Sequence, residues 1–536
     1  MFLPTLLLGI AASVSAAAAQ AGDRLTTGNG NSTILNPMFP GFYPDPSCIY
    51  VPEWDKTFFC ASSSFNAFPG IPIHASKDLH HWKLIGRALN RREQLPRLAH
   101  TNRSTSGIWA PTIRFHDDTF WVVTTLVDDD RPQADASRWD NIIFKSKDPY
   151  DPASWSVAVH FNYTGYDPDL FWDDDGKVYL TAAHAWQVGP YIEQAEVIDL
   201  DKGIIGEWRI IWNGTGGLAP EGPHIYRKDG WYYLLAAEGG TGMNHMVTIA
   251  RSRNISGPYE SNPANPVLTN ANTTSMFQTV GHADLFQDGN GNWWAVALST
   301  RSGPGYLHYP MGRETVLTTV RWPEGEWPTF TPIAGEISAW PTPLEDLNIR
   351  GVGPFVNHPP LATEHLTFPP NTPLPAHLTH WRFPISSSYT PSPPEKPNTL
   401  RLTPSRLNLT ALNGNHAGPE GQTFISRRQQ HTLFSFDVEL EFVPNQAGEE
   451  AGVSAFLTQN HHLDMGVVLL PRREATGNWP GEEGQEAEEG KGEDLALHVR
   501  FRGVLLGIYA TTNGGNGTTP AYFSNWRYTP LEQFRD

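Results

Sequence analysis

One pattern recurs five times in this chain, at intervals of 53 to 62 residues. Each copy has a turn, followed by a run that opens with aromatic or β-branched residues and closes with small ones. A repeat at a fixed period indicates that one supersecondary unit is used many times. The five copies are WDKTFFCASS from Trp54, DDTFWVVTTL from Asp117, DGKVYLTAAH from Asp175, DGWYYLLAAE from Asp229 and NGNWWAVALS from Asn290.

A second short strand precedes each copy, and Asp/Gly turns join the two, as in the DDDG run that ends at Gly176. Each pair therefore predicts a β-hairpin. Five such units of about 60 residues predict an all-β chain with a five-bladed β-propeller over residues 30–335, a fold that repeats radially. The upstream strands are DPSCIY from Asp45, APTIRF from Ala110, DPDLFW from Asp167, EGPHIY from Glu221 and HADLFQ from His282.

Composition excludes several other classes of protein. The 536 residues include 48 glycines and 46 prolines, with 12% aromatic and only 18% charged residues. These values argue against a helical bundle or coiled coil, and the aromatic content argues against disorder. The net charge of −18 argues against a nucleic-acid partner.

The residues that open the five upstream strands should converge at the propeller axis. They are Asp45, Ala110 (with Trp109 beside it), Asp167, Glu221 and His282. Unpaired buried acids are costly, and acids gathered in a cleft indicate function. Two carboxyl groups facing a pocket are what glycoside hydrolysis requires, one as acid and one as base or nucleophile. A third carboxylate nearby raises the pKa of the acid by repulsion.

Eight segments in order resemble glycoside hydrolase family 43, above all its β-xylosidases and α-L-arabinofuranosidases. They are NPMFPGFYPDPS (36–47), SSFNAFPG (63–70), IWAP (108–111), YDPDLFWDDDG (166–176), PEGPHIY (220–226), AAEGGTG (236–242), GHADL (281–285) and MGRET (311–315). The resemblance implies an inverting enzyme in which Asp45 is the general base and Glu221 the general acid. It implies that Asp167 raises the pKa of the acid and orients it. Asp169 is the competitor for that role; the spacing of Asp167 to its strand matches Asp45 and Glu221 better.

The resemblance also implies residues that bind substrate. Arg313 resembles the pocket arginine that hydrogen-bonds substrate hydroxyls, and Phe65 and Trp109 resemble the aromatic pocket wall. His282 resembles an axial histidine near a water or a bound cation, often calcium. No cofactor is required, and a structural calcium ion at the axis is the one metal that the resemblance suggests. For each of these four residues, core packing or a structural ion pair is the alternative.

The remainder of the chain predicts a linker and a second domain. Residues 336–397 are Pro-rich and predict a linker that contains a strand or two. Alternating patterns in residues 398–536 predict a β-sandwich. It resembles the concanavalin-like C-terminal domain of family 43 β-xylosidases, with FISRRQQH (424–431) as the most similar segment. Related chains usually carry further strands between LALHVR (495–500) and FRGVLLGIYA (501–510), and these are absent here. An acidic run at 481–494 lies just before that point. The sandwich could therefore be incomplete.

Residues 1–21 have the apolar stretch and small residues of a secretory signal peptide. Sequons for N-glycosylation begin at Asn31, Asn102, Asn162, Asn213, Asn254, Asn272, Asn408 and Asn516. We therefore expect a secreted, extracellular glycoprotein without a membrane anchor. Cys48 and Cys60 flank a turn, and either a disulfide or two buried thiols fits this spacing.

The sequence thus predicts a secreted exo-glycosidase that hydrolyses terminal β-1,4-xylosyl residues of xylan or xylo-oligosaccharides. An α-L-arabinofuranosidase, or an enzyme with both activities on arabinosyl-substituted plant polysaccharides, is the alternative. A non-catalytic sugar-binding propeller is less favoured, since the three acids are present. A retaining fructosidase is also less favoured, since its NDPNG and RDP segments are absent.

Overall fold

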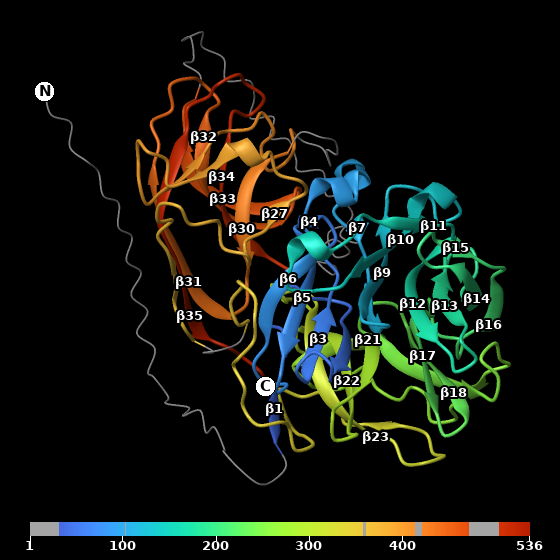
Figure 1. Ribbon diagram of the computed structural model, residues 1–536. Helices are drawn as coiled ribbons and strands as arrows, with labels where there is room; N and C mark the ends of the chain where they lie inside the picture. The colour runs from blue at the N-terminus through green and yellow to red at the C-terminus, as the bar shows by residue number, and fades with distance from the viewer. Residues whose placement is uncertain (1–31, 102, 357–360, 413–420, 471–502) are drawn as a thin grey trace, which may run out of the picture.

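The computed structural model describes residues 32–101, 103–356, 361–412, 421–470 and 503–536 (Figure 1). In these ranges the regular structure is nearly all β, with five short 3-10 helices. None of the helices described is long and apolar enough to cross a membrane. The predicted signal peptide, the sequons at Asn31 and Asn102 and the acidic run at 481–494 lie outside the described residues.

Five antiparallel sheets follow one another along the chain. The first contains β2 (Ser47–Val51), β3 (Thr57–Ala61), β5 (Gly70–Ser76) and β6 (Lys83–Leu89). The second contains β7 (Gly107–Ile108), β8 (Thr112–His116), β9 (Thr119–Val127), β10 (Trp139–Ser146) and β11 (Val159–Phe161). The third contains β12 (Gly165–Trp172), β13 (Val178–His184), β14 (Ile192–Asp199), β15 (Ile204–Ile205) and β16 (Arg209–Trp212).

The fourth sheet contains β17 (Glu221–Lys228), β18 (Trp231–Glu238), β19 (Met246–Ser252) and β20 (Glu260–Ser261). The fifth contains β21 (Phe277–Gln287), β22 (Trp293–Arg301), β23 (Glu314–Arg321) and β24 (Thr329–Phe330). All five predicted hairpins are confirmed: β2 pairs with β3, β8 with β9, β12 with β13, β17 with β18 and β21 with β22.

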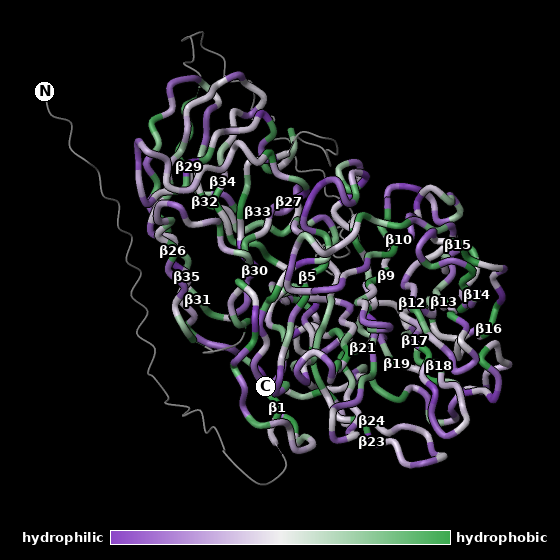
Figure 2. The backbone as a smooth tube through the Cα atoms, in the orientation of Figure 1, coloured by the Kyte–Doolittle hydropathy of each residue, from purple (hydrophilic) through white to green (hydrophobic). Residues whose placement is uncertain are grey.

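The first strands of the five hairpins contact one another in a closed cycle. β2 contacts β8, β8 contacts β12, β12 contacts β17, β17 contacts β21, and β21 returns to β2. Apolar side chains fill the space between neighbouring sheets, as where Phe58 of β3 meets Phe286 of β21 edge to face. Figure 2 shows the same distribution, with hydrophobic stretches along the strands and hydrophilic residues in many of the turns. The cycle brings the openings of the five strands together.

Apart from β27, the described strands after residue 360 form two further antiparallel sheets, gathered apart from β9–β18 in Figure 1. One contains β26 (Glu364–Leu366), β28 (Tyr389–Pro391), β29 (Leu400–Leu402), β31 (Leu433–Glu441) and β35 (Ala521–Glu532). The other contains β30 (Thr423–Arg428), β32 (Glu450–Thr458), β33 (His461–Val468) and β34 (Leu505–Thr511). Buried residues of both sheets, such as Trp526 and Ile508, share one core.

The stretch expected to be a linker, 336–397, pairs with both parts of the molecule. Its β26 and β28 belong to the C-terminal sheet, where they pair with β35 and β29. β25 (Glu336–Ser338) pairs with β1 (Thr33–Leu35), and β27 (His380–Trp381) pairs with β4 (Ala67–Phe68). Farther along, Arg428 Nε donates a hydrogen bond of 2.9 Å to the carbonyl of Phe42. The C-terminal sheets are thus anchored on the segments next to Asp45. Within the first sheet, a disulfide joins Cys48 and Cys60 across β2 and β3.

Candidate active site

Three of the residues that the sequence placed at strand openings share an unusual backbone, although β21 begins at Phe277 and His282 therefore lies inside its strand. Asp45, Asp167 and His282 have φ angles of 53°, 54° and 50°, in the left-handed region that few non-glycine residues adopt. The pairing register also shifts between Tyr166 and Asp169 and between Gly281 and Asp284. A local bulge of this kind re-aims side chains away from the regular alternation of a strand. Strained backbone of this type tends to gather at functional sites.

Asp45 accepts hydrogen bonds at both carboxylate oxygens. Arg313 NH1 donates to Oδ1 at 2.8 Å, and the hydroxyl of Ser63 donates to Oδ2. Asp45 and Arg313 are both nearly fully buried. The carboxylate is therefore held in one orientation by two donors from different segments of the chain.

Glu221 opens β17 and has one oxygen available. The Tyr166 hydroxyl donates to Oε2 at 3.2 Å, whereas the buried Oε1 has no hydrogen-bond partner among the described residues. Burial, together with the negative charge of Asp45, raises the pKa of Glu221 to about 7, against the opposing effects of Arg313 and Tyr166. This carboxyl group can hold a proton near neutral pH and present it at Oε1.

Asp167 lies against the same acid. The N–H of Gly222 donates to its Oδ2 at 3.0 Å. Burial and the charges of Glu221 and Asp45 raise the pKa of Asp167 well above its ordinary value. Two neighbouring carboxyl groups of this kind titrate as a pair that keeps a proton. Asp169, the competitor, points elsewhere: Arg114 NH2 lies 2.9 Å from its Oδ1.

The predicted aromatic residues form a chain of contacts between Asp45 and Glu221, which we call the aromatic wall. The Arg313 guanidinium lies 5.4 Å from the centre of the Phe65 ring. Phe65 and Trp109 have ring centres 6.4 Å apart, and Trp109 meets Tyr166 edge to face at 5.5 Å. Asp45, Arg313, Phe65, Trp109, Tyr166 and Glu221 are thereby linked in that order. Aromatic rings beside carboxyl groups suit the apolar faces and hydroxyl edges of a sugar.

His282 lies close to the acid but does not sit in a ligand cluster. A Cβ atom on Gly222 would come within 2.9 Å of its Nε2, so only glycine leaves room for this ring. Burial lowers the pKa of His282 to about 4, which leaves the imidazole neutral at pH 7. No group of three His, Cys, Asp or Glu side chains able to hold a metal occurs in the described ranges. Calcium at this position stays a prediction.

A second set of polar residues lies farther along the same strands, and the sequence-based reasoning missed it. We call it the axial network; its members are Ser47 of β2, Arg114 of β8, Asp169 of β12, His224 and Tyr226 of β17, and Asp284 of β21. Asp284 accepts from Ser47 Oγ at 2.6 Å, from Tyr226 Oη at 2.6 Å and from Arg114 NH1 at 3.0 Å. Every strand of the cycle thus contributes at least one member.

Arg114 decides the electrostatics of this network. Burial alone would raise the pKa of Asp284, but the charges of Arg114 and His224 outweigh it and hold that pKa well below its ordinary value. The signal that could have revealed the network is spacing. Ser47, Asp169 and Asp284 each lie two residues after Asp45, Asp167 and His282.

Family comparison divides the chain in two. Residues 34–328 match the model of the glycosyl hydrolases family 43, which is more than half of the chain. Residues 368–478 match the model of the β-xylosidase C-terminal concanavalin A-like domain. All of the residues placed at the strand openings fall within the first match.

Two characterised relatives cover most of the chain. A non-reducing end α-L-arabinofuranosidase of Bacteroides ovatus is 36% identical over 93% of this chain and 95% of its own length. A β-xylosidase of Bacillus subtilis is 31% identical over 81% of each chain. Among solved structures, the family 43 protein BlXynB of Bacillus licheniformis, in a mutant form, aligns with a TM-score of 0.76 and 29% identity. That alignment covers 93% of this chain and 100% of the other.

Proposed function

This chain belongs to glycosyl hydrolases family 43, and on that premise we propose that it is an inverting exo-glycosidase that releases terminal β-1,4-linked xylosyl residues. The observation that carries the proposal is Glu221. It is a buried carboxyl group whose pKa is raised to about 7 by burial and the charge of Asp45. Its Oε1 has no hydrogen-bond partner among the described residues, and His245 Nε2 lies 3.9 Å from that atom. An acid of this kind is what protonation of a glycosidic oxygen requires.

In the proposed reaction, Glu221 transfers its proton from Oε1 to the oxygen that leaves with the rest of the chain. Asp45 takes a proton from a water molecule, and the resulting hydroxide attacks the anomeric carbon from the opposite face as the glycosidic bond breaks. One C–O bond forms and one breaks, and the anomeric configuration inverts. Arg313 and Ser63 orient Asp45 through the two hydrogen bonds to its oxygens.

Asp167 is the proposed modulator of the acid. Its charge and that of Glu221 repel each other, so the pair retains a proton where an isolated carboxyl group would have lost it. When substrate is bound, the glycosidic oxygen lies at Glu221 Oε1 and can accept a hydrogen bond from it. The shared proton therefore resides on Glu221 in that complex. Asp169 does not fill this role, because Arg114 neutralises it.

The closed cycle of inner strands supports the further proposal that the five sheets are the blades of a five-bladed β-propeller with the site at its axis. Residues 1–21, the disulfide and the exposed sequons at Asn213, Asn254 and Asn272 support secretion as a glycoprotein. The aromatic wall supports a carbohydrate as substrate.

The second candidate function is α-L-arabinofuranosidase activity, alone or together with xylosidase activity. The specific observation in its favour is the 36% identity to the Bacteroides ovatus enzyme over nearly the whole length of both chains. The β-xylosidase of Bacillus subtilis is 31% identical, so identity alone does not separate the two.

The deciding experiment is a side-by-side assay on aryl β-xyloside and aryl α-L-arabinofuranoside. We expect turnover of the xyloside, with the first-formed xylose in the α configuration by NMR. Turnover of the arabinofuranoside alone would replace the first proposal with the second, and a β-configured product would refute inversion. Glu221→Gln should abolish most turnover of natural xylosides, and activity equal to the parent would refute its assignment as the acid.

A further inference from the structure

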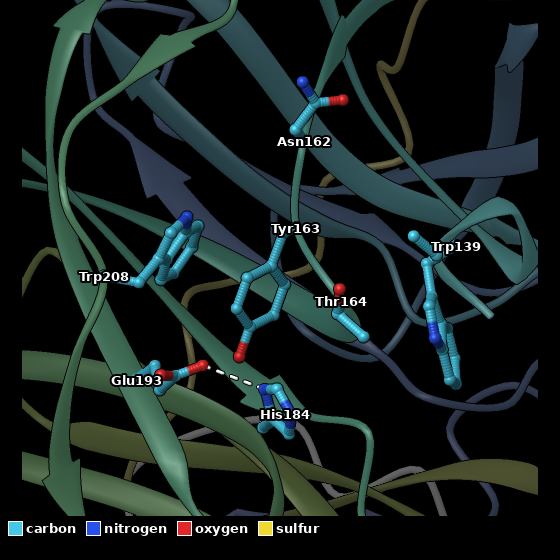
Figure 3. Close-up of a pocket in the computed structure, with 8 residues that line it drawn as sticks. Trp139, Asn162, Tyr163, Thr164, His184, Glu193 and Trp208 are labelled. Carbon is cyan, nitrogen blue, oxygen red and sulfur yellow. Dashed lines mark hydrogen bonds and ion pairs between the residues drawn. The ribbon is translucent and has the colours of Figure 1, made fainter. Parts of the chain in front are cut away.

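A cavity of about 370 Å³ opens beside the candidate active site, between the second and third sheets (Figure 3). Binding pockets for small molecules occupy roughly 300–1,000 Å³, so this one suits a small ligand. The residues that line it and carry the argument are Trp139, Asn162, Tyr163, His184, Glu193 and Trp208.

Aromatic rings form two walls of the cavity. Tyr163 stacks on Trp208 with ring centres 4.0 Å apart and an interplanar angle of 28°. Trp139 lies across from them in Figure 3. Trp208 precedes β16 and is only half-buried, so part of its ring remains accessible. Exposed ring surface of this kind binds the apolar face of a ligand that is wet on its other side.

The polar groups in the cavity favour a neutral ligand rich in hydroxyls. His184 Nδ1 and Glu193 Oε2 lie 3.0 Å apart, and their side chains are 15% and 14% exposed. The hydroxyl of Thr164 and the amide of Asn162 add donors and acceptors. The lining contains no lysine or arginine. The carboxylate of Glu193 disfavours phosphate or uronate groups, so aromatic faces with mixed donors and acceptors point to an uncharged sugar.

Two stacked rings separate this cavity from the proposed acid. Tyr166, which donates to Glu221, stacks on Trp139 with ring centres 5.5 Å apart and an interplanar angle of 16°. The glycosidic oxygen must lie at Glu221, so the leaving part of the substrate departs from the side of the acid. The contacts from Glu221 to Tyr166 and from Tyr166 to Trp139 connect that side of the site to the cavity, which Trp139 lines.

We propose that this cavity binds an uncharged sugar unit of the substrate's leaving portion, one that is distant from the bond being cleaved. The proposal rests on the proposed glycosidase function for the identity of the substrate, but not for the binding itself. Trp208, backed by the buried Tyr163, supplies the stacking face, and the His184–Glu193 pair receives the hydroxyl groups. The site would therefore favour longer or branched substrates over short ones.

The chain itself offers a second source of sugar. Asn162, Tyr163 and Thr164 form a sequon, all three line the cavity, and Asn162 is exposed. An N-glycan attached at Asn162 would compete for the same space. The experiment must therefore compare protein made in a bacterium that adds no glycan with protein made in a glycosylating eukaryotic host.

The test is calorimetric titration of xylotetraose onto full-length protein in the Glu221→Gln background, which reports binding without turnover. Adding Trp208→Ala should weaken binding about tenfold, the size expected for loss of one aromatic stacking partner. Adding Glu193→Gln, which keeps the shape of the side chain, should weaken it severalfold. Trp340→Ala, which removes a tryptophan from a different cavity, should leave the titration unchanged.

Each outcome decides the proposal. Unchanged affinity in both Trp208→Ala and Glu193→Gln would overturn it, even if the enzyme proves active on xylosides. An affinity loss in these variants would support it, even if no xyloside is turned over. If eukaryotic protein binds as weakly as the Trp208→Ala variant while Asn162→Gln restores affinity, the same cavity accepts the glycan, which supports the sugar chemistry. Loss of affinity in Trp340→Ala equal to that in Trp208→Ala would contradict it.

Discussion

The site and the axial network contain the same residue type on the same strands, yet the two layers differ in electrostatics. Asp167 and Asp284 are both buried aspartates on inner strands, β12 and β21. The pKa of Asp167 is raised well above its ordinary value, whereas that of Asp284 is held well below its own. Burial acts in the same direction on both. Arg114 and His224 face Asp284, whereas Asp167 faces two further carboxyl groups.

This contrast shows that charge partners, and not burial, assign the roles of the two layers. Where carboxyl groups face one another, a proton is retained and acid chemistry becomes available. Where a guanidinium joins two carboxylates, the charges are compensated and the strands are held together. The two layers lie only two residues apart along each strand. Regular alternation would put Asp167 and Asp169 on the same face, but the bulge between Tyr166 and Asp169 breaks it and gives them different partners.

The largest effect should follow from Asp45→Asn. The variant keeps the shape of the side chain and tolerates the left-handed backbone, but it cannot take a proton from water. We expect kcat to fall by roughly 10³-fold, within the 10²–10⁴ that general acid–base groups contribute. The free energy of unfolding should fall less than in Asp284→Asn, because loss of the ion pair with buried Arg313 is partly offset by weaker repulsion on Glu221 and Asp167. Steady-state kinetics on aryl β-xyloside and urea denaturation measure the two quantities, and retained activity would remove Asp45 from the proposed mechanism.

The next largest effect concerns the stability of the protein and tests the axial network. Asp284→Asn removes a fully buried charge and leaves the partly buried Arg114 with only Asp169 to compensate it, so we expect a loss of about 3–5 kcal/mol in the free energy of unfolding. Urea denaturation at pH 7 measures it.

The matched control is Asp201→Asn, which removes an aspartate that is 65% exposed and paired with Lys145. Its effect should stay below about 0.5 kcal/mol. Equal losses in the two variants would mean that the axial network contributes no more than a surface ion pair.

The third effect is a pH dependence of stability. The pKa of Glu221 is about 7 in the folded protein against an ordinary value of 4.5, so the folded state binds the proton more tightly than the unfolded state. The free energy of unfolding should therefore fall as the pH rises from about 4.5 to about 7, by up to roughly 3 kcal/mol. Glu221→Gln should flatten this slope. Urea midpoints measured across that range test it, and equal slopes in parent and variant would contradict the raised pKa.

The axial network should show the opposite dependence of stability on pH. The pKa of Asp284 is lowered on folding, so its stabilising contribution is present above its ordinary value near 4 and is lost as the pH falls. The loss of unfolding free energy predicted above for Asp284→Asn should accordingly shrink under acid conditions. A loss that grows as the pH falls would contradict the lowered pKa of Asp284, and with it the contrast to Asp167.

The sequence predicted the features that depend on periodicity. The five hairpins, the convergence of Asp45, Asp167 and Glu221, and the strands of the C-terminal region all follow from alternation and turn residues. In β30, Arg427 and Arg428 interrupt the apolar pattern, and both are buried in the structure. These arginines contact distant segments of the chain; Arg428, for example, donates a hydrogen bond to the carbonyl of Phe42.

The features that sequence reasoning missed depend on contacts between sheets. Nothing near Arg114 in the chain indicates that it pairs with Asp169 and Asp284, which lie 55 and 170 residues away. Tyr166 lay within a recognised motif, but its hydrogen bond to Glu221 depends on how two sheets pack. The cavity around Trp208 likewise combines residues from three strands and from three segments that connect strands.

The left-handed backbone at Asp45 and Asp167 also restricts how this protein can evolve. Most side chains are strained in that conformation, by roughly 1–2 kcal/mol, whereas asparagine adopts it readily. A single nucleotide change converts an aspartate codon to an asparagine codon. The least disruptive route to losing catalysis therefore retains the folded pocket and its aromatic wall. Descendants of such an enzyme that carry asparagine at these positions would be expected to survive as sugar-binding proteins.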